Sequence, residues 1–225
     1  NNAQTWCLLG QLLRKTKRRG NAISCLQKAY QMAPNNPEIL TNLGLLQYDL
    51  GLFKSAVQTQ RAALQLAPNQ PTILTNLGNA LRATGDLTEA LEYYDQALDL
   101  APNAAGVEWN RAVVLLLSGN YKSGFSAMEG RFNQQGRIVP EWLEWRWDGR
   151  DLQGGILLIE AEQGFGDLLQ FARFFLLASK KNAVIILRCH PRMQKIMRSI
   201  PGVTDVCSNQ KPPPAYQARI SLFSL

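Results

Sequence analysis

The feature that most constrains this sequence is a repeat with a period of 34 residues. The triplet Ala-Pro-Asn occurs at 33–35, 67–69 and 101–103, and the hexapeptide ILTNLG occurs at 39–44 and 73–78. Glycines keep the same spacing at two places in the repeat: Gly10, Gly44 and Gly78, and then Gly51, Gly85 and Gly119. Because every unit of a periodic chain packs against its neighbours in the same way, the period predicts an array of similar units.

Small residues align when the repeats are set at 3–36, 37–70, 71–104 and 105–138. The aligned columns are Gly10, Gly44, Gly78 and Ala112; Ala22, Ala56, Ala90 and Gly124; and Ala29, Ala63, Ala97 and Arg131. Small side chains allow neighbouring helix backbones to approach closely. The period and the columns resemble the tetratricopeptide repeat, a unit of two antiparallel helices. The resemblance implies an all-α solenoid of about four helix pairs over residues 1–138, with the fourth pair degenerate.

The same resemblance implies a concave groove, lined by the first helix of each pair, that binds an extended peptide or protein. Asn42, Asn76 and Asn110 occupy one repeat position on three successive first helices. Asparagine is a mediocre helix former, so three in register favour a shared role. One interpretation is a ladder of amides that grips the backbone of a bound peptide. The alternative is interhelical hydrogen bonding that only sets the register of the helices.

Basic residues are sparse on the predicted first helices. The first interhelical turn holds one basic run, which we interpret as a solvated loop: Arg14, Lys15, Lys17, Arg18 and Arg19. The first helices of repeats two to four carry only Arg82 and Arg111. This scarcity disfavours a clamp for the terminal carboxylate of a peptide.

Composition excludes several functional classes. The hydrophobic content of 46% and the charged content of 18% are typical of a soluble globular protein. The net charge of +7 is spread evenly along the chain, which disfavours a nucleic-acid partner. No apolar run approaches the roughly 18 residues that span a bilayer, and no signal peptide opens the chain. The chain starts at Asn1 rather than at methionine, so we expect a fragment of a longer protein.

The cysteines and the single histidine disfavour a metal site. Cys7, Cys25, Cys189 and Cys207 show no CxxC spacing, and His190 is the only histidine. Neither a zinc site nor a disulfide framework is predicted, and a reducing cytoplasm is the expected location.

A junction at residues 139–155 breaks the repeat and is rich in tryptophan and glycine. We expect Trp142, Trp145 and Trp147, together with Phe132, to pack the following segment on the fourth repeat as one rigid body. Beyond it, the sequence predicts strands at 156–161, 183–189, 203–206 and 219–225, with helices at 167–179 and 191–200 between them. Alternating strands and helices predict a partial Rossmann-like α/β parallel sheet over residues 156–225.

The first loop of this segment reads EQGFGD, residues 162–167. A glycine-rich turn from a parallel strand into a helix presents backbone N–H groups to a phosphate, at the sheet edge where ligands gather. Gln163, Gly164, Phe165 and Gly166 are therefore candidate residues of a phosphate or ligand loop. The loop lacks both the GxGxxG fingerprint and the lysine of a P-loop.

The motifs around this loop resemble those of a known class of transferase. WDGRDLQGGILLIEAEQGFGDLLQFARF and HPRMQKIMRSIPGVTDV resemble bacterial proteins that fuse tetratricopeptide repeats to a GT-B glycosyltransferase-like domain, similar in layout to O-linked N-acetylglucosamine transferase. The GD turn also resembles that of heptosyltransferases. The resemblance implies Asp167 as a catalytic base, Glu162 as a second carboxylate and a nucleotide sugar as donor. Alternatively, Asp167 only stabilises the start of a helix, and Glu160 and Glu162 only pair with basic neighbours.

The chain departs from that class in length. A GT-B enzyme needs a second lobe for most of its nucleotide-sugar contacts, and these 225 residues hold only an incomplete first lobe. We therefore predict a protein-interaction module that binds no cofactor and is inactive alone, with its open sheet covered by the repeats or by a dimer partner. The alternatives are a fragment of an O-linked glycosyltransferase, whose repeats recruit a protein or glycan acceptor, and a nucleotide-binding regulatory protein.

Overall fold

The computed structural model describes residues 2–129, 146–161 and 164–225, in two compact units that comprise residues 1–134 and 135–225. Several residues named above lie outside the described ranges: Arg131, Phe132, Trp142, Trp145, Glu162 and Gln163.

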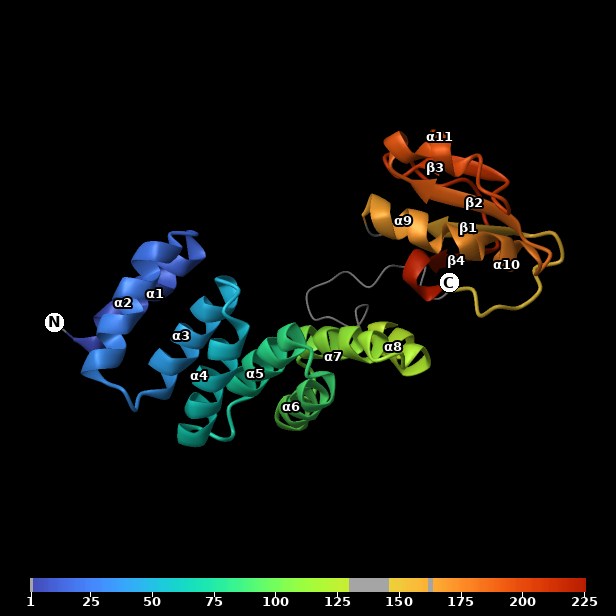
Figure 1. Cartoon of the computed structure of the whole chain (residues 1–225). Coiled ribbons are helices and arrows are strands. Elements are labelled where there is room, and N and C mark those ends of the chain that lie inside the picture. The colour runs from blue at the N-terminus through green and yellow to red at the C-terminus, as the bar shows by residue number, and fades with distance from the viewer. Residues whose placement is uncertain (1, 130–145, 162–163) are drawn as a thin grey trace. The chain divides into compact units, whose positions relative to one another are not determined.

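The described part of the first unit consists of eight α-helices in four pairs (Figure 1). The helices are α1 (Ala3–Lys15), α2 (Arg19–Met32), α3 (Pro37–Asp49), α4 (Phe53–Leu66), α5 (Pro71–Thr84), α6 (Leu87–Leu100), α7 (Ala105–Leu117) and α8 (Tyr121–Met128). Each helix contacts the next one in sequence, and each first helix also contacts the first helix of the next pair. The solenoid of helix pairs predicted from the period is therefore confirmed.

The ends of the helices follow from local chemistry. The Asn36 side chain accepts hydrogen bonds from the backbone N–H groups of Glu38 (2.9 Å) and Ile39 (3.4 Å), which caps α3. Proline opens α3 and α5, at the position where its missing N–H costs nothing. Gly85 ends α5 in the left-handed region (φ 95°), which glycine adopts without strain.

A glycine on each of the first three first helices makes room for a side chain of its partner helix. A Cβ atom at Gly10 would lie 2.6 Å from the Leu26 side chain, and one at Gly78 would lie 2.7 Å from the Tyr94 ring. Gly44 stands in the same relation to Gln60, at 2.5 Å. The columns of small residues are therefore set by close packing within each helix pair.

The second unit contains a parallel four-stranded sheet. Its elements are β1 (Ile156–Glu160), α9 (Phe165–Phe171), a 3₁₀ turn (Ala172–Phe174), α10 (Phe175–Ser179), β2 (Val184–Cys189), a 3₁₀ turn (Pro191–Met193), α11 (Gln194–Met197), β3 (Asp205–Ser208), β4 (Ala218–Ser221) and a final 3₁₀ turn (Leu222–Ser224). The strand order is β3-β2-β1-β4, and every pairing is parallel. The chain thus winds outward from β1 to β3 and then returns to the other side of β1.

Both faces of the sheet bury apolar side chains. Leu157, Ile159, Ile185 and Leu187 alternate onto one face and are fully buried. The opposite face buries Leu158 and Ile186 and also carries Glu160 with its arginine partners, which are described below. Among the helices, α10 contacts β2 and α11 contacts β3 (Figure 1).

Four predicted elements differ in detail. The helix predicted at 191–200 is a 3₁₀ turn followed by the short α11, and the strand predicted at 219–225 ends at Ser221, after which a 3₁₀ turn follows. The helix predicted at 167–179 is divided by a 3₁₀ turn, and the third strand begins at Asp205 rather than at 203. The later start has a physical reason, because Gly202 is left-handed (φ 91°) and a Cβ there would lie 2.7 Å from the backbone of Leu176. The turn that packs against α10 therefore occupies residues that were expected to begin the strand.

Trp147, the one junction tryptophan within the described ranges, is buried inside the second unit. Its indole Nε1–H donates to the carbonyl of Arg150 (2.8 Å), and its backbone N–H donates to the carbonyl of Arg219 on β4 (2.9 Å). This residue therefore extends the sheet edge beside β4.

Candidate peptide-binding groove

The candidate groove is the surface formed by the four first helices, α1, α3, α5 and α7. Their sequential contacts bring one turn of each helix beside the same turn of the next. Residues 34 apart in the sequence therefore lie along the groove, and the predicted asparagine column follows it.

Asn42 is buried and already hydrogen-bonded. Its amide Nδ2 donates to the carbonyl of Glu38 (2.8 Å) on the same helix and to the Cys7 sulfur of α1 (3.4 Å). The bond to Cys7 joins two first helices, which is the interhelical arrangement considered above. Burial raises the pKa of the Cys7 thiol, and the Glu38 carboxylate adds to that effect.

Asn76 and Asn110 differ from Asn42. Both are half-buried, and the Nδ2 atom of Asn76 is shielded from solvent without a hydrogen-bond partner among the described residues. A buried amide N–H without a partner is energetically costly and is a group that an incoming carbonyl would satisfy.

A carboxylate lies between the first two first helices without a cationic partner among the described residues. Glu38 accepts hydrogen bonds from the side-chain amides of Gln4 (3.0 Å) and Gln11 (3.3 Å). In the last turn of the same helices, Arg14 pairs with Asp49 (2.8 Å). The sequence analysis did not predict these contacts, although Gln4 with Glu38 and Arg14 with Asp49 are 34 and 35 residues apart.

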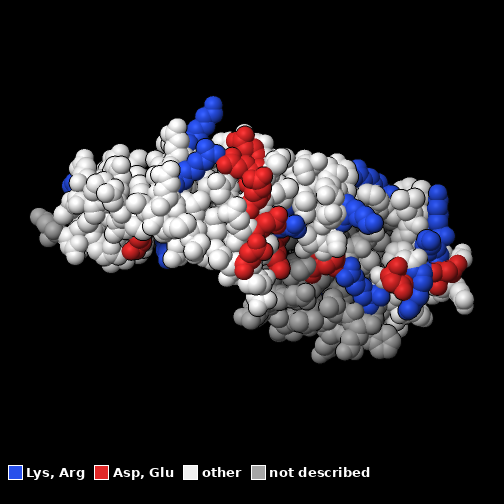
Figure 2. Space-filling model, turned by 90° about the horizontal axis from the view of Figure 1, so that it is seen from below, with Lys and Arg blue, Asp and Glu red and all other residues white. Residues whose placement is uncertain are grey.

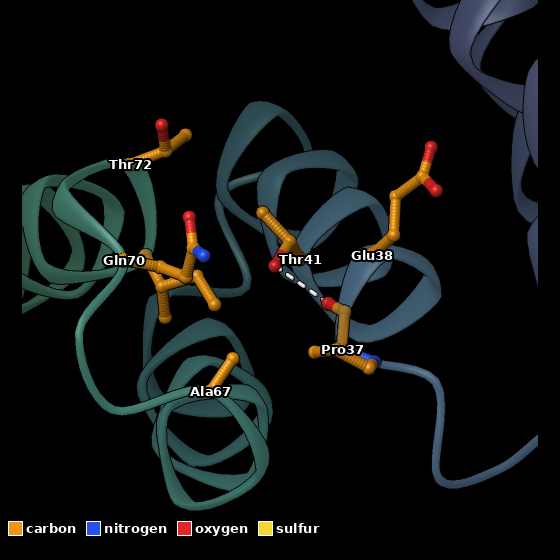
Figure 3. Close-up of a pocket in the computed structure, with 7 residues that line it drawn as sticks. Pro37, Glu38, Thr41, Ala67, Gln70 and Thr72 are labelled. Atoms are coloured by element: carbon orange, nitrogen blue, oxygen red, sulfur yellow. Dashed lines mark hydrogen bonds between the residues drawn. The ribbon is translucent and has the colours of Figure 1, made fainter.

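An apolar pocket of about 320 Å³ opens between the second and third repeats. Pro37, Glu38 and Thr41 of α3 form one side, Thr72 and Ile73 of α5 form the other, and Ala67 and Gln70 close the end. Figure 3 shows Glu38 and Thr72 on opposite sides of the opening, and the Thr41 hydroxyl donating to the carbonyl of Pro37 (2.7 Å). Because that hydroxyl is satisfied within α3, the pocket presents mainly carbon to a ligand.

Charge gathers on one second helix. α6 contains four acidic residues, Glu89, Glu92, Asp95 and Asp99, and no basic residue. Figure 2 shows the acidic stripe that crosses this part of the molecule. Two of the carboxylates pair with neighbouring repeats, since Arg61 contacts Glu89 (2.6 Å) and Arg111 contacts Asp95 (2.5 Å). Arg111, one of the few basic residues on a first helix, is thereby directed toward α6.

The glycine loop of the second unit lies at the carboxyl end of β1. Gly164 is the N-cap of α9, and Asp167 lies in the first turn of that helix, where a carboxylate is stabilised. A Cβ at Gly164 would lie 3.7 Å from the Asp167 carboxylate, whereas one at Gly166 would meet nothing within 4 Å. Neither glycine is left-handed, so the backbone of the loop does not itself require glycine at these positions.

Two aromatic rings meet beside the loop. The rings of Phe165 and His190 lie 5.4 Å apart, and His190 Nδ1 accepts from the backbone N–H of Arg192 (3.2 Å). Because Phe165 follows β1 and His190 follows β2, the carboxyl edge brings them together. The sequence analysis did not predict this contact of His190.

Glu160, Arg188 and Arg219 form an ion triad on the face of the sheet opposite to Leu157 and Ile159. The Glu160 carboxylate contacts Arg219 of β4 (2.6 Å) and Arg188 of β2 (3.2 Å), and all three side chains are largely buried. Arg188 also donates to the carbonyls of Asn209 (3.1 Å) and Lys211 (2.8 Å). Glu160 therefore pairs with basic neighbours, which is the alternative given for this residue in the sequence analysis.

The described ranges contain neither a candidate metal cluster nor a candidate membrane-spanning helix. They hold no cluster of three or more histidine, cysteine or acidic residues that fits a metal ion. No helix within them is both long and apolar enough to cross a membrane.

Comparison with known families identifies the repeats. Models described as tetratricopeptide repeat match residues 7–71 and 71–104. Over 70 residues the chain is 39% identical to Protein FlbA of Caulobacter vibrioides, a match that covers 30% of this chain and only 12% of that protein. Residues 7–104 of the helical array are therefore tetratricopeptide repeats.

Solved structures share the fold. MamA of Desulfovibrio magneticus matches with a TM-score of 0.55 and 18% identity, over 60% of this chain and 79% of its own. A TPR protein of Thermus thermophilus matches with a TM-score of 0.54 and 22% identity, over 59% and 74%. The first TPR of Spaghetti (RPAP3), bound to an HSP90 peptide, matches with a TM-score of 0.51 and 24% identity, over 52% and 94%. At these identities the likeness shows the fold alone.

Proposed function

We propose that the repeats bind an extended peptide of a partner protein in the groove of α1, α3, α5 and α7. The observation that carries the proposal is the apolar pocket between α3 and α5. Asn76 lies on α5, and its amide Nδ2 has no hydrogen-bond partner among the described residues. One apolar side chain of the peptide enters the pocket. The peptide backbone accepts hydrogen bonds from Asn76 and Asn110.

The three asparagines contribute unequally in this arrangement. The amide of Asn42 already donates hydrogen bonds to Glu38 and Cys7, so we expect it to stabilise the helices more than it contributes to peptide binding. The amide of Asn76 gains a partner only when the peptide binds, which favours the bound state.

The charges on the groove favour a peptide that is neutral or basic beside the pocket. Glu38 stands at the opening and is held by two neutral amides, so a positive group on the peptide would give it a counter-ion. The RPAP3 repeats were solved with the peptide SRMEEVD, and that complex supports peptide binding as the use of this fold.

The experiment is a peptide selection followed by calorimetry. A random peptide library is selected on the whole chain, and the affinity of the best peptide is compared among variants. Asn76→Ala should weaken binding roughly fivefold to tenfold, as expected for the loss of one hydrogen bond of about 1 kcal/mol, and Asn42→Ala should weaken it less.

A pocket variant separates the groove from the rest of the surface. Ala67→Trp fills the pocket and should abolish binding of the selected peptide, whereas Ala101→Trp, at the equivalent site one repeat later, should not. Selected peptides whose affinity is unaffected by both Asn76→Ala and Ala67→Trp would refute binding in this groove.

We also propose that the second unit is the first lobe of a glycosyltransferase-like domain. Its strand order, β3-β2-β1-β4, supports a doubly wound sheet with its switch point between β1 and β4, where ligands of such sheets bind. The loop from Gly164 to Asp167 leaves the sheet at that point. In a complete cleft, Asp167 would accept the proton of an acceptor hydroxyl, and a nucleotide sugar would be the donor.

The test of this second proposal is a panel of nucleotide sugars. The chain alone should show weak nucleotide binding without release of nucleoside diphosphate, because glycosyl transfer depends on orienting both reactants. Turnover that disappears in Asp167→Asn would show instead that these residues contain a complete active site.

We place the protein in a reducing cytoplasm, which the four free thiols support. A dimer through the second unit also remains a prediction. It is supported by Leu169, Leu176, Leu177 and Ile196, which are large apolar side chains exposed on the helices of that unit.

A further inference from the structure

One carboxylate of the groove has no counter-charge among the described residues. α1 and α3 carry two acidic residues, Glu38 and Asp49, and Asp49 pairs with Arg14 (2.8 Å). The exposed Glu38 carboxylate accepts hydrogen bonds from the neutral side-chain amides of Gln4 (3.0 Å) and Gln11 (3.3 Å). These amides fix the position of the carboxylate but leave its charge uncompensated, so a cation of a ligand can still pair with it.

The repeat confines this negative charge to one place in the groove. Gln4, Thr72 and Gly106 occupy the same repeat position as Glu38 on the other three first helices, and none of them is ionisable. Burial and then the Glu38 carboxylate raise the pKa of the Cys7 thiol on α1, so the negative potential extends over the boundary between α1 and α3.

This charged place lies beside the apolar pocket but does not coincide with it. The Glu38 carboxylate is bonded to α1, whereas the pocket opens between α3 and α5. Figure 3 shows the Glu38 side chain extending from α3 on the side away from Gln70 and Thr72. Neighbouring first helices contact each other, and the axes of packed helices lie about 8–10 Å apart. The two places are therefore about one helix spacing apart.

The geometry of an extended peptide sets the spacing of the residues that can reach both places. Side chains two residues apart point to the same side of an extended chain, and their Cα atoms lie about 7 Å apart. Side chains one or three residues apart point to opposite sides. A long basic side chain spans the small remaining distance when an apolar side chain two residues away fills the pocket.

We propose that the groove selects peptides in which a lysine or arginine lies two residues from the apolar side chain that fills the pocket, with Glu38 as the specificity-determining residue. This inference rests on the proposed binding of a peptide in the groove and adds the composition of that peptide. An acidic side chain at the same place would face a carboxylate without a counter-ion, so the groove discriminates between peptides by charge as well as by shape.

The test is a selection from blocked nonapeptides that have leucine at the centre and random residues elsewhere. The whole chain should enrich lysine or arginine at the second residue before or after the leucine. The best arginine peptide is then compared by calorimetry with a copy that carries citrulline, which keeps the shape of arginine without its charge. The arginine peptide should bind about threefold to fivefold more tightly at low salt, as expected for an exposed ion pair, and the difference should shrink as salt is added.

Variants of two exposed carboxylates assign the preference to its residue. Glu38→Gln should bind the arginine and citrulline peptides equally, and Glu38→Lys should enrich acidic residues at the same peptide position. Glu92→Gln, which removes a carboxylate from α6 rather than from a first helix, should keep the preference of the unaltered chain.

The outcomes separate this inference from peptide binding itself. Peptides that are lost in Ala67→Trp but show no basic residue at the expected position would overturn the specificity and leave binding in the groove intact. An arginine preference that persists in Glu38→Gln would do the same. Selected peptides that bind Ala67→Trp as tightly as the unaltered chain would overturn both proposals.

Discussion

At the scale of single residues, each of the first three helix pairs is held by a fit between a glycine and a side chain 16 residues later. The partner is Leu26 for Gly10, Gln60 for Gly44 and Tyr94 for Gly78. These three side chains differ in stiffness, although the glycine is the same. The cost of filling the glycine position should therefore depend on which residue faces it.

We predict that Gly78→Ala destabilises the array more than Gly44→Ala. The new methyl group at residue 78 meets the rigid, fully buried ring of Tyr94, and overpacking of this kind costs roughly 1–3 kcal/mol. At residue 44 it meets the end of Gln60, which can turn aside with the loss of its bond to the carbonyl of Thr41. Gly106→Ala, at an open helical position, is the control and should be neutral or stabilising by up to about 1 kcal/mol. The measurement is urea unfolding, and equal losses at residues 44 and 78 would contradict the argument.

Tyr94 also predicts a dependence of stability on alkaline pH. The pKa of its phenol is raised to about 12, mainly because the side chain is buried. The phenol O–H donates a hydrogen bond to Asn79 Oδ1 (2.7 Å). The folded state thus keeps a proton that the unfolded state loses above its ordinary pKa of 10. Stability from this group is complete below pH 10 and should be lost as pH rises toward 12. Tyr94→Phe should remove this part of the alkaline loss in unfolding curves measured across that range, at a cost of about 1 kcal/mol near neutrality.

At the scale of secondary-structure elements, the sheet is tied across three strands by Glu160, Arg188 and Arg219. One carboxylate serves two guanidinium groups in a largely buried place. Such a triad is sensitive to the loss of its carboxylate, because both guanidinium groups would then lose a charged partner in a largely buried place.

We predict that Glu160→Gln destabilises the second unit by about 3 kcal/mol, since it leaves two poorly solvated arginines. Glu89→Gln is the matched control, because Glu89 pairs with Arg61 on an exposed surface and such pairs contribute at most about 1 kcal/mol. Thermal unfolding monitored by circular dichroism measures both. A loss at Glu160 no larger than that at Glu89 would show that the triad does not stabilise the sheet.

The elements also show where sequence reasoning succeeds and where it stops. The helix pairs were predictable because Gly10, Gly44 and Gly78 recur with their alanine columns, and each repeat adds independent evidence. The strands were predictable from apolar runs, but β3 was placed two residues early because Gly202 meets α10 through a contact remote in sequence. The pocket at Ile73 was not predicted, and the sequence left two roles open for Asn42, because both features depend on distances between helices that no local pattern encodes.

At the scale of the whole molecule, the chain combines a periodic unit with an aperiodic one. The repeats contact only their neighbours, so their stability grows with each added pair. The sheet of the second unit is held by pairings between strands far apart in sequence, which form or fail together.

We predict that the buried Trp147 protects the start of the second unit in limited proteolysis. Its indole bond to Arg150 and its backbone bond to β4 should keep residues 147–155 uncut for as long as the sheet remains folded. The measurement is a digestion time course read by mass spectrometry, with Glu160→Gln as a variant that should expose these residues sooner. Rapid cleavage within residues 147–155 of the unaltered chain would contradict the prediction.

The glycine fits have a consequence for inheritance and for engineering. Each glycine and its facing side chain form a matched set, so a repeat that is duplicated or moved whole carries its own complement with it. A crossover inside a repeat, between the glycine and the facing residue, breaks the match. The recombined repeat then has either a cavity, where two small residues face each other, or a clash, where two large ones do. In repeat four the close approach is made at another place: Ala112 occupies the former glycine position, and Gly124 of the second helix faces Leu116, whose side chain lies 2.6 Å from where a Cβ would stand. Arrays of this kind should therefore lengthen and shorten by complete 34-residue cassettes, and the two positions should change together when they change at all.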